Sequence, residues 1–359
     1  MTRVVHLHIG APKTGTTYVQ DRFSLNVDEL AKHGVNYPGR TLGDPSTFHF
    51  RAALDLLGQD WGGSPGHASG SWDAMVRKVR RQRGKVVISH EILAPAPPEK
   101  VAKVMRDLRG SEIHLVYSVR DLGRQLPAAW QESIKQGRKW SFRRFLDSTE
   151  RGNVWFARAF DLPGVLGTWG KDLPPERVHV VTVPRRNSKD PDLLWRRFCQ
   201  ALDVDPSWAP LDSTKSNQSL GTVETQLIRR LNRKIGRGPR HEANYDDLVL
   251  RLLAREELSG KRRSPKVTLP PDRFEWAEQQ GRIWIDWLAG SGVDVVGDPA
   301  ELMPRRPDPD APWADPDRVR SRPLMRAALD ALEVMTREAA SRPDPFLRRA
   351  RRKLGRDPS

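Results

Sequence analysis

The sequence has a single cysteine and no long apolar run. One cysteine, Cys199, excludes an intrachain disulfide and a zinc site built from several cysteines. No stretch approaches the roughly 18 consecutive apolar residues of a membrane-spanning helix. The segment after Met1 also lacks the apolar region of a secretory signal. We therefore expect a soluble, cytoplasmic protein without a transmembrane segment.

Acidic residues are too few to balance the basic ones. The 359 residues include 61 Lys and Arg against 45 Asp and Glu, a formal charge of +16. Such an excess favours anionic partners, such as a nucleotide or an acidic substrate. The alternative is that the arginines are spread over solvated surfaces, because a charge count does not reveal clustering. The basic run at 348–353 has little aromatic interleaving, so we interpret it as a solvated tail and expect no specific nucleic-acid partner.

Apolar strand-like runs alternate with segments of helical periodicity. The expected strands are 4–9, 35–37, 85–89, 112–119, 177–183 and 293–297. The expected helices are 15–33, 48–58, 71–83, 98–109, 123–137, 190–202, 218–256, 271–291 and 318–340. This alternation predicts an α/β fold with a parallel sheet covered on both faces. We predict one α/β domain over 1–303 and a Pro/Arg-rich tail with one helix over 304–359.

The most informative segment is the Gly/Pro turn at 10–17, between the first strand and the first helix. Backbone N–H groups of such a loop, together with the positive end of the helix, form a cradle for phosphate or sulfate. Gly10 and Gly15 have the spacing of a Walker A loop. However, Thr16 stands where the Walker lysine belongs, and Lys13 lies inside the loop. The sequence therefore predicts an anion cradle with a displaced cation.

The six residues Pro12, Lys13, Thr14, Gly15, Thr16 and Thr17 fit the 5′-phosphosulfate loop of the sulfotransferase superfamily at every position. The chain resembles the bacterial members of that superfamily. The resemblance implies a P-loop NTPase-like three-layer fold in which these six residues bind 3′-phosphoadenosine 5′-phosphosulfate (PAPS). It further implies in-line transfer of a sulfuryl group to a hydroxyl or amine of an unidentified small-molecule or carbohydrate acceptor. No metal is expected, because cations and backbone dipoles meet the charge of the donor.

A second anion-binding residue, Arg120, follows the strand 112–119. Open α/β sheets bind ligands at this carboxyl edge, and a guanidinium binds phosphate through two parallel hydrogen bonds. The resemblance implies that Arg120 holds the 3′-phosphate together with a serine eight residues later, where this chain has Ala128. The candidates to replace that serine are Ser118, Ser133 and Arg124. The basic loop at 261–263 is a further candidate by its chemistry.

The general base is expected where the strand 85–89 ends. His90 and Glu91 follow this strand, and the resemblance makes either the base, with Glu91 favoured by the bacterial branch. An imidazole has the more suitable ordinary pKa, whereas a glutamate needs its pKa raised by burial. The alternative is a pair that only caps the sheet edge. Lys13 is expected to stabilise charge on the sulfuryl group, and His49 and segment 185–188 are further candidates for the acceptor pocket.

Two other functions fit parts of the sequence. A P-loop phosphotransferase would use Mg²⁺ and a lysine after Gly15, and Thr16 in that place disfavours it. A non-catalytic nucleotide or polyanion binder stays open because Ala128 replaces the expected serine.

Overall fold

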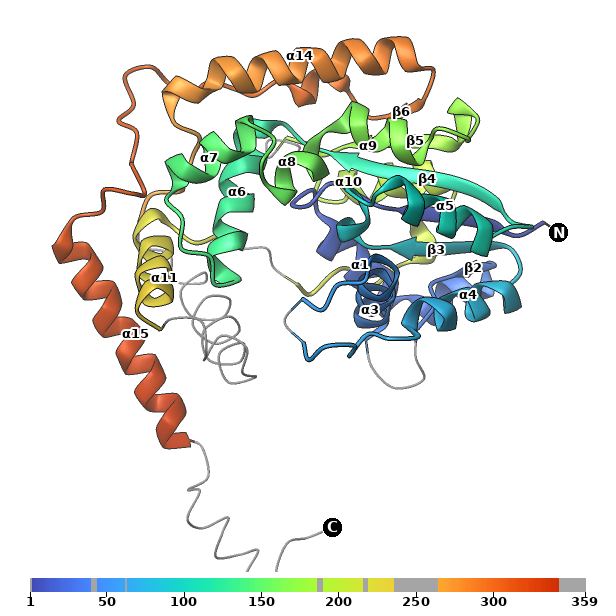
Figure 1. Ribbon diagram of the computed structural model, residues 1–359, viewed down its shortest axis with the longest axis horizontal. Coiled ribbons are helices and arrows are strands. Elements are labelled where there is room, and N and C mark those ends of the chain that lie inside the picture. The colour runs from blue at the N-terminus through green and yellow to red at the C-terminus, as the bar shows by residue number, and fades with distance from the viewer. Residues whose placement is uncertain are drawn as a thin grey trace, which may run out of the picture. The chain divides into compact units, whose positions relative to one another are not determined.

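The computed structural model describes residues 2–39, 44–61, 63–185, 190–215, 219–235 and 264–341 (Figure 1). Contacts within the chain define two compact units. The first comprises 1–130, 143–217 and 268–313, and the second comprises 131–142, 218–267 and 314–359. No helix among the described residues is long and apolar enough to cross a membrane. The predicted domain division after residue 303 stays a prediction.

A six-stranded sheet with only parallel pairings forms the centre of the first unit. The strands are β1 (Val4–His8), β2 (Val35–Asn36), β3 (Lys85–Ser89), β4 (Glu112–Val119), β5 (Val178–Thr182) and β6 (Asp294–Val296), in the order β2-β3-β1-β4-β5-β6. The strand β1 lies between β3 and β4, and His8 pairs with Ser89 on one side and Val116 on the other. The segments that follow these three strands therefore begin at one edge of the sheet.

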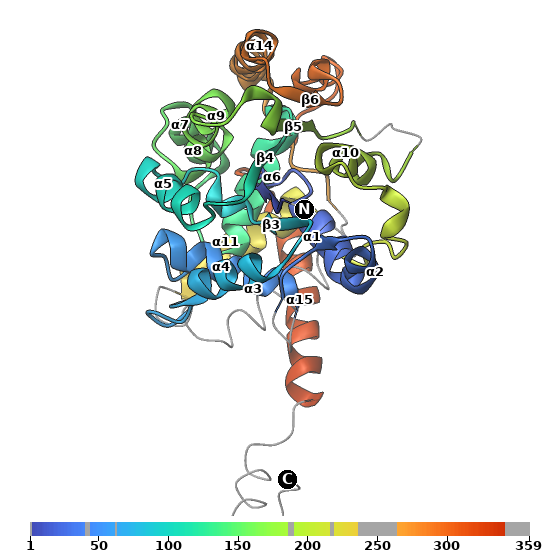
Figure 2. The same ribbon diagram turned by 90° about the vertical axis from the view of Figure 1, so that its right-hand side faces the viewer.

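Helices cover both faces of this sheet, as Figure 2 shows. One face carries α1 (Thr16–Leu25), α2 (Val27–Lys32) and α10 (Leu193–Leu202), and the other carries α5 (Pro98–Asp107), α8 (Trp155–Phe160) and α9 (Leu162–Trp169). Phe23, Trp195 and Phe198 form a buried core with sheet residues on the first face. On the second face, the hydroxyl of Tyr117 donates to Ala159 O at 2.9 Å. The predicted P-loop NTPase-like three-layer α/β fold is confirmed.

The remaining elements of the first unit surround this three-layer body. They are α3 (Pro45–Leu57), α4 (Ser71–Arg81), α14 (Phe274–Ser291), most of α6 (Leu122–Lys135) and α7 (Phe142–Glu150), and the short helices η1 (Glu91–Leu93), η2 (Pro175–Arg177), η3 (Pro206–Trp208), η6 (Pro271–Arg273) and η7 (Pro299–Leu302). In the second unit, α11 (Thr222–Ile235) packs against α15 (Ser321–Ser341). The buried Asn232 there donates to Ile134 O at 2.7 Å and to Arg138 O at 3.0 Å.

Two features differ from the sequence-based expectation. The single helix predicted over 15–33 is two helices, because Asn26 interrupts it. The amide of Asn26 donates to Leu211 O at 2.7 Å, and its oxygen accepts from Leu211 N at 2.9 Å, so this residue is tied to a distant loop. In addition, α7, α8 and α9 occupy a stretch to which the periodicity assigned no element. Of the helix predicted over 218–256, α11 is confirmed and residues 236–263 lie outside the described ones.

Candidate functional site

The loop between β1 and α1 turns through three residues of positive φ. These are Gly10 (27°), Lys13 (68°) and Gly15 (94°). Positive φ is uncommon for a residue with a side chain, so Lys13 is held there by its surroundings. At Gly10 a side chain has no room, since a Cβ would lie 2.7 Å from His8 Nε2 and 2.9 Å from Ser118 Oγ. The loop therefore lies directly on the side chains at the sheet edge.

The N-terminus of α1 is open for an anion. Its N-cap residue is Gly15, and no side chain accepts a hydrogen bond from the first turn. The hydroxyl of Thr16, in that first turn, is buried and has no hydrogen-bond partner among the described residues. Uncapped N–H groups and the helix dipole both favour a negative group at this position. The first turn of α1 thus has no side-chain cap, and the buried hydroxyl beside it has no partner among the described residues.

A chain of buried hydrogen bonds fixes the loop from beneath. His8 Nδ1 lies 2.7 Å from Ser89 Oγ, and His8 Nε2 lies 3.4 Å from Ser118 Oγ. Ser118 Oγ lies 2.5 Å from Thr14 Oγ1, which donates to Ala11 O at 2.5 Å. One consistent direction satisfies every group: Ser89 donates to His8, His8 to Ser118, Ser118 to Thr14, and Thr14 to the backbone carbonyl.

This arrangement requires a neutral imidazole at His8. Burial, with a smaller contribution from His90, lowers the pKa of His8 from 6.5 to about 3. The Thr14 hydroxyl is committed to the loop, so a ligand would meet only the backbone N–H of this residue. Sequence reasoning missed His8 because a histidine inside an apolar strand gives no signal of its partners.

Two polar side chains from the β4–α6 segment reach the loop. Arg120 Nη1 donates to Lys13 O at 3.3 Å, and Gln125 Nε2 donates to Pro12 O at 2.8 Å. The Gln125 Oε1 atom is buried and has no hydrogen-bond partner within the described part of the chain. The structure thereby brings Arg120 and the predicted loop into direct contact. Sequence reasoning did not identify Gln125, which lies one helical turn beyond the strand end.

The neighbours of Arg120 are engaged elsewhere. Asp121 pairs with Arg124, whose guanidinium also donates to Pro184 O at 3.0 Å. Ser118 belongs to the buried chain beneath the loop, and Ser133, in the second unit, accepts a hydrogen bond from Trp140 Nε1 at 2.8 Å. The polar groups of all three candidates to replace the serine at Ala128 therefore already hold protein partners.

At the end of β3, the side chains of His90 and Glu91 differ in their hydrogen-bond partners and therefore in their ability to accept a proton. His90 Nδ1 accepts from Ile92 N at 3.3 Å, and its ring stacks on Phe50 at 4.9 Å. Burial lowers the pKa of His90. An imidazole that accepts at Nδ1 carries its proton on Nε2, where it is a donor and not a base. Glu91 Oε2 lies 3.8 Å from His90 Nδ1 and has no hydrogen-bond partner among the residues that the structure describes.

The other predicted pocket residues are in two groups. His49 is part of the framework, because it donates from Nε2 to Pro38 O at 2.8 Å and accepts at Nδ1 from Ser89 N at 3.1 Å. Burial lowers the pKa of His49 to about 3. Within the segment 185–188, only Arg185 is described, and it donates to Ala300 O at 2.6 Å. Residues 186–188 and the basic loop 261–263 lie outside the described residues.

Comparison with known proteins provides little information about the function of this chain. No protein-family model and no curated protein sequence matches the chain. A search of solved structures found a sulfotransferase from Alicyclobacillus acidocaldarius, which is 17% identical, with a TM-score of 0.37. The match covers 68% of this chain and 94% of that one. A similarity at this level does not support an argument about function.

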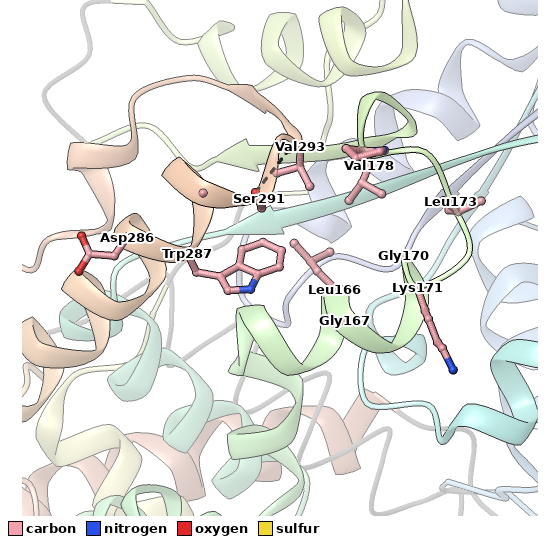
Figure 3. A pocket seen from close by; sticks show the side chains of 12 residues that line it. Leu166, Gly167, Gly170, Lys171, Leu173, Val178, Asp286, Trp287, Ser291 and Val293 are labelled. Atoms are coloured by element: carbon pink, nitrogen blue, oxygen red, sulfur yellow. Dashed lines mark hydrogen bonds between the residues drawn. The ribbon is translucent and has the colours of Figure 1, made fainter.

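A cavity of about 440 Å³ lies elsewhere in the first unit (Figure 3). Its lining comes from α9, the segment 170–178 and the end of α14, with Trp287 facing Leu166. Val178, in its wall, begins β5, whereas the loop 10–15 follows the end of β1. In a parallel sheet, the first residues of the strands and the loops that follow their last residues lie at opposite ends of the strands. None of the predicted site residues lines this cavity.

Proposed function

We propose that the chain is a sulfotransferase that moves a sulfuryl group from PAPS to a hydroxyl or amine of an acceptor. The observation that carries the proposal is the anion cradle at α1. It combines an uncapped helix N-terminus, the buried Thr16 hydroxyl, which has no partner among the described residues, and Arg120 hydrogen-bonded to the backbone of Lys13. Sulfate and phosphate esters are the anions that such a cradle favours.

Each predicted residue has a distinct role in the proposed reaction. The loop from Pro12 to Thr17 holds the 5′-phosphosulfate, and Arg120 holds the 3′-phosphate. The donor supplies the sulfuryl group, so the bond from sulfur to the bridging oxygen breaks while the acceptor oxygen or nitrogen bonds to sulfur. Lys13 and the loop amides stabilise the charge on the departing oxygen.

Glu91 receives the acceptor proton in this proposal. Its carboxylate oxygen Oε2 has no hydrogen-bond partner among the described residues, while the neutral His90 ring, which accepts at Nδ1, carries its proton on Nε2. His90 then orients the acceptor or the carboxylate. His8 and His90 both have lowered pKa values, so near neutral pH neither imidazole adds positive charge to the cradle. Lys13 and Arg120 are the cations that the proposal assigns to the donor.

Thermal unfolding with and without 3′-phosphoadenosine 5′-phosphate, the desulfonated donor, tests the donor site. A ligand at about a hundred times its Kd adds roughly 2.7 kcal/mol to the stability of the folded state. We expect this nucleotide to raise the melting temperature of the wild type and of Arg77→Ala, an exposed arginine on α4. The Arg120→Ala variant should lose the shift.

ATP with Mg²⁺ is the second ligand in the same assay. A shift with ATP and Mg²⁺ alone would replace the sulfotransferase with a phosphotransferase. Equal shifts by both nucleotides, unchanged in Arg120→Ala, would contradict a 3′-phosphate site at this arginine. Absence of any shift would favour a fold that does not bind the donor.

A further inference from the structure

Three histidines lie in a row across one face of the sheet, away from the proposed donor loop. His6, His114 and His179 come from β1, β4 and β5, and Asp294 of β6 continues the row. The rings of His6 and His114 are tilted, with centroids 5.0 Å apart. The rings of His114 and His179 are nearly coplanar, with centroids 5.2 Å apart and planes at 7°. The last pair therefore meets edge to edge.

Side-chain hydrogen bonds join four members of this region into a continuous chain. Glu112 Oε1 lies 3.0 Å from His114 Nε2, and His114 Nδ1 lies 2.8 Å from His179 Nε2. His179 Nδ1 lies 2.7 Å from Asp294 Oδ2. All three distances are those of good hydrogen bonds. We call these four residues the carboxylate–histidine chain.

Counting protons along this chain gives its charge. An ionised carboxylate only accepts hydrogen bonds, so the ring nitrogens that face Glu112 and Asp294 must both carry protons. The hydrogen bond between the rings needs a third N–H. Two neutral imidazoles supply only two protons, so the three hydrogen bonds need one more.

We propose that the carboxylate–histidine chain is a proton-binding site, in which one excess proton is held by His114 and His179 between two carboxylates. The proton completes a connection across β4, β5 and the edge strand β6. Without it, one of the three hydrogen bonds is lost: either the lone pair of a ring nitrogen faces a carboxylate oxygen, or the lone pairs of His114 Nδ1 and His179 Nε2 face each other.

The surroundings indicate which ring holds the proton. Burial lowers the pKa of His179, although Asp294 opposes this effect, and burial also lowers the pKa of His6. The hydrogen bond from His114 lowers the pKa of Glu112 and keeps this carboxylate ionised. Burial therefore disfavours the excess proton on the His179 ring.

Other charged groups near the row are paired. Arg177 of η2 lies 3.5 Å from Glu112, and Lys85 of β3, which acts on His6, lies 2.7 Å from Asp203. On α10, which packs against β5 and β6, Arg197 binds Glu301 and Arg196 binds Asp190. No group of three or more His, Cys, Asp or Glu in the described ranges is arranged to hold a metal ion. A proton is thus the ligand that this geometry fits.

The site has a defined effect on stability. The excess proton is bound in the folded state with three hydrogen bonds, and these are not formed in the unfolded chain. The excess proton adds stability below the pH at which the folded pair releases it, and this stability is lost above that pH; the effect opposes the lowering of the His179 pKa by burial. The loss should affect β6 most, because only three of its residues pair with β5.

Amide substitutions at the ends of the chain test the proton count. In Glu112→Gln, the side-chain amide donates to His114 Nε2, so two neutral rings complete the chain. In Asp294→Asn, the amide donates to His179 Nδ1, His179 Nε2 donates to His114 Nδ1, and His114 Nε2 still donates to Glu112, again with neutral rings. Each variant keeps the shape of the wild-type side chain and removes the need for the excess proton.

The experiment is ¹⁵N NMR of the histidine rings between pH 5 and 9, with His114→Gln and His179→Gln for assignment. At pH 7 we expect one wild-type ring of the pair to have both nitrogens protonated. In both amide variants that ring should be neutral, with a titration midpoint at least one pH unit lower, a tenfold change in proton affinity. Wild-type rings that are both neutral at pH 7, or a midpoint unchanged in both variants, would overturn the proposal.

Hydrogen exchange of the β6 amides gives an independent readout. After correction for intrinsic rates, opening of β6 should increase about tenfold in the wild type between pH 6 and pH 9, the scale of one charge-assisted hydrogen bond. It should stay constant in Glu112→Gln. An equal increase in the two proteins would show that the proton does not hold this edge. Neither readout depends on the proposed sulfotransferase activity.

Discussion

Replacing Ser118 by alanine tests the buried chain that fixes the loop 10–15. The hydroxyl of this side chain accepts from His8 Nε2 and donates to Thr14 Oγ1, and the residue is fully buried. Alanine leaves the His8 N–H without an acceptor in a place that is closed to solvent. A buried donor without a partner costs about 1–3 kcal/mol. We expect Ser118→Ala to lose about 2 kcal/mol, roughly thirtyfold in the folding equilibrium.

The assay is urea unfolding followed by fluorescence and circular dichroism, with coincident transitions as the condition for analysis. Ser69→Ala, at an exposed serine, is the matched control and should change stability by less than about 0.5 kcal/mol. Thr14→Val completes a double-mutant cycle, in which two members of one hydrogen-bonded chain should couple by about 0.5 kcal/mol or more. A loss for Ser118→Ala equal to that of the control, or full additivity with Thr14→Val, would refute the reasoning.

Two further predictions concern the same region. Gly10→Ala should destabilise the fold by at least about 2 kcal/mol more than Gly66→Ala, measured by urea unfolding, because both have positive φ but only the Cβ at position 10 meets buried atoms; equal losses would contradict the clash. Lowering the pH from 6.5 to 5 should destabilise the fold by roughly 2 kcal/mol for each of His8 and His49, since the unfolded chain binds protons that these buried rings do not. His49→Gln should remove one of these contributions from the pH dependence of the unfolding free energy, and an unchanged slope would argue against a neutral His49.

The sheet could be predicted from the sequence because each strand is a short apolar run with turn-forming or polar residues at both ends. For example, Lys85–Ser89 and Glu112–Val119 have the predicted boundaries. The helices were less predictable where a single polar residue decides whether a helix continues or ends. Nothing in the local pattern shows that Asn26 binds Leu211 and splits one helix into two. Likewise α8 and α9 are too short for their periodicity to be recognised.

The candidate site was predictable in its backbone and not in its side-chain network. The Gly/Pro pattern at 10–15 and Arg120 after β4 were evident, because turn residues and strand ends leave local signals. Which hydroxyls face the ligand depends on contacts across the sheet. Thr14 is committed to the loop, whereas Thr16 in the same motif has no hydrogen-bond partner among the described residues. Sequence reasoning treated these two threonines alike.

Two histidines of β1, His6 and His8, show why such roles need the structure. They are two residues apart and point to the same face of the sheet, and burial lowers the pKa of both. His8 is hydrogen-bonded to hydroxyl groups, and the chain of hydrogen bonds ends on a backbone carbonyl. Every donor in this chain therefore has an acceptor while the imidazole of His8 is neutral. Next to His6, the chain through His114 and His179 ends on carboxylates at both sides, so it needs an added proton. The charge of each network is decided by what lies at its ends, and those ends come from strands and loops far apart in the sequence.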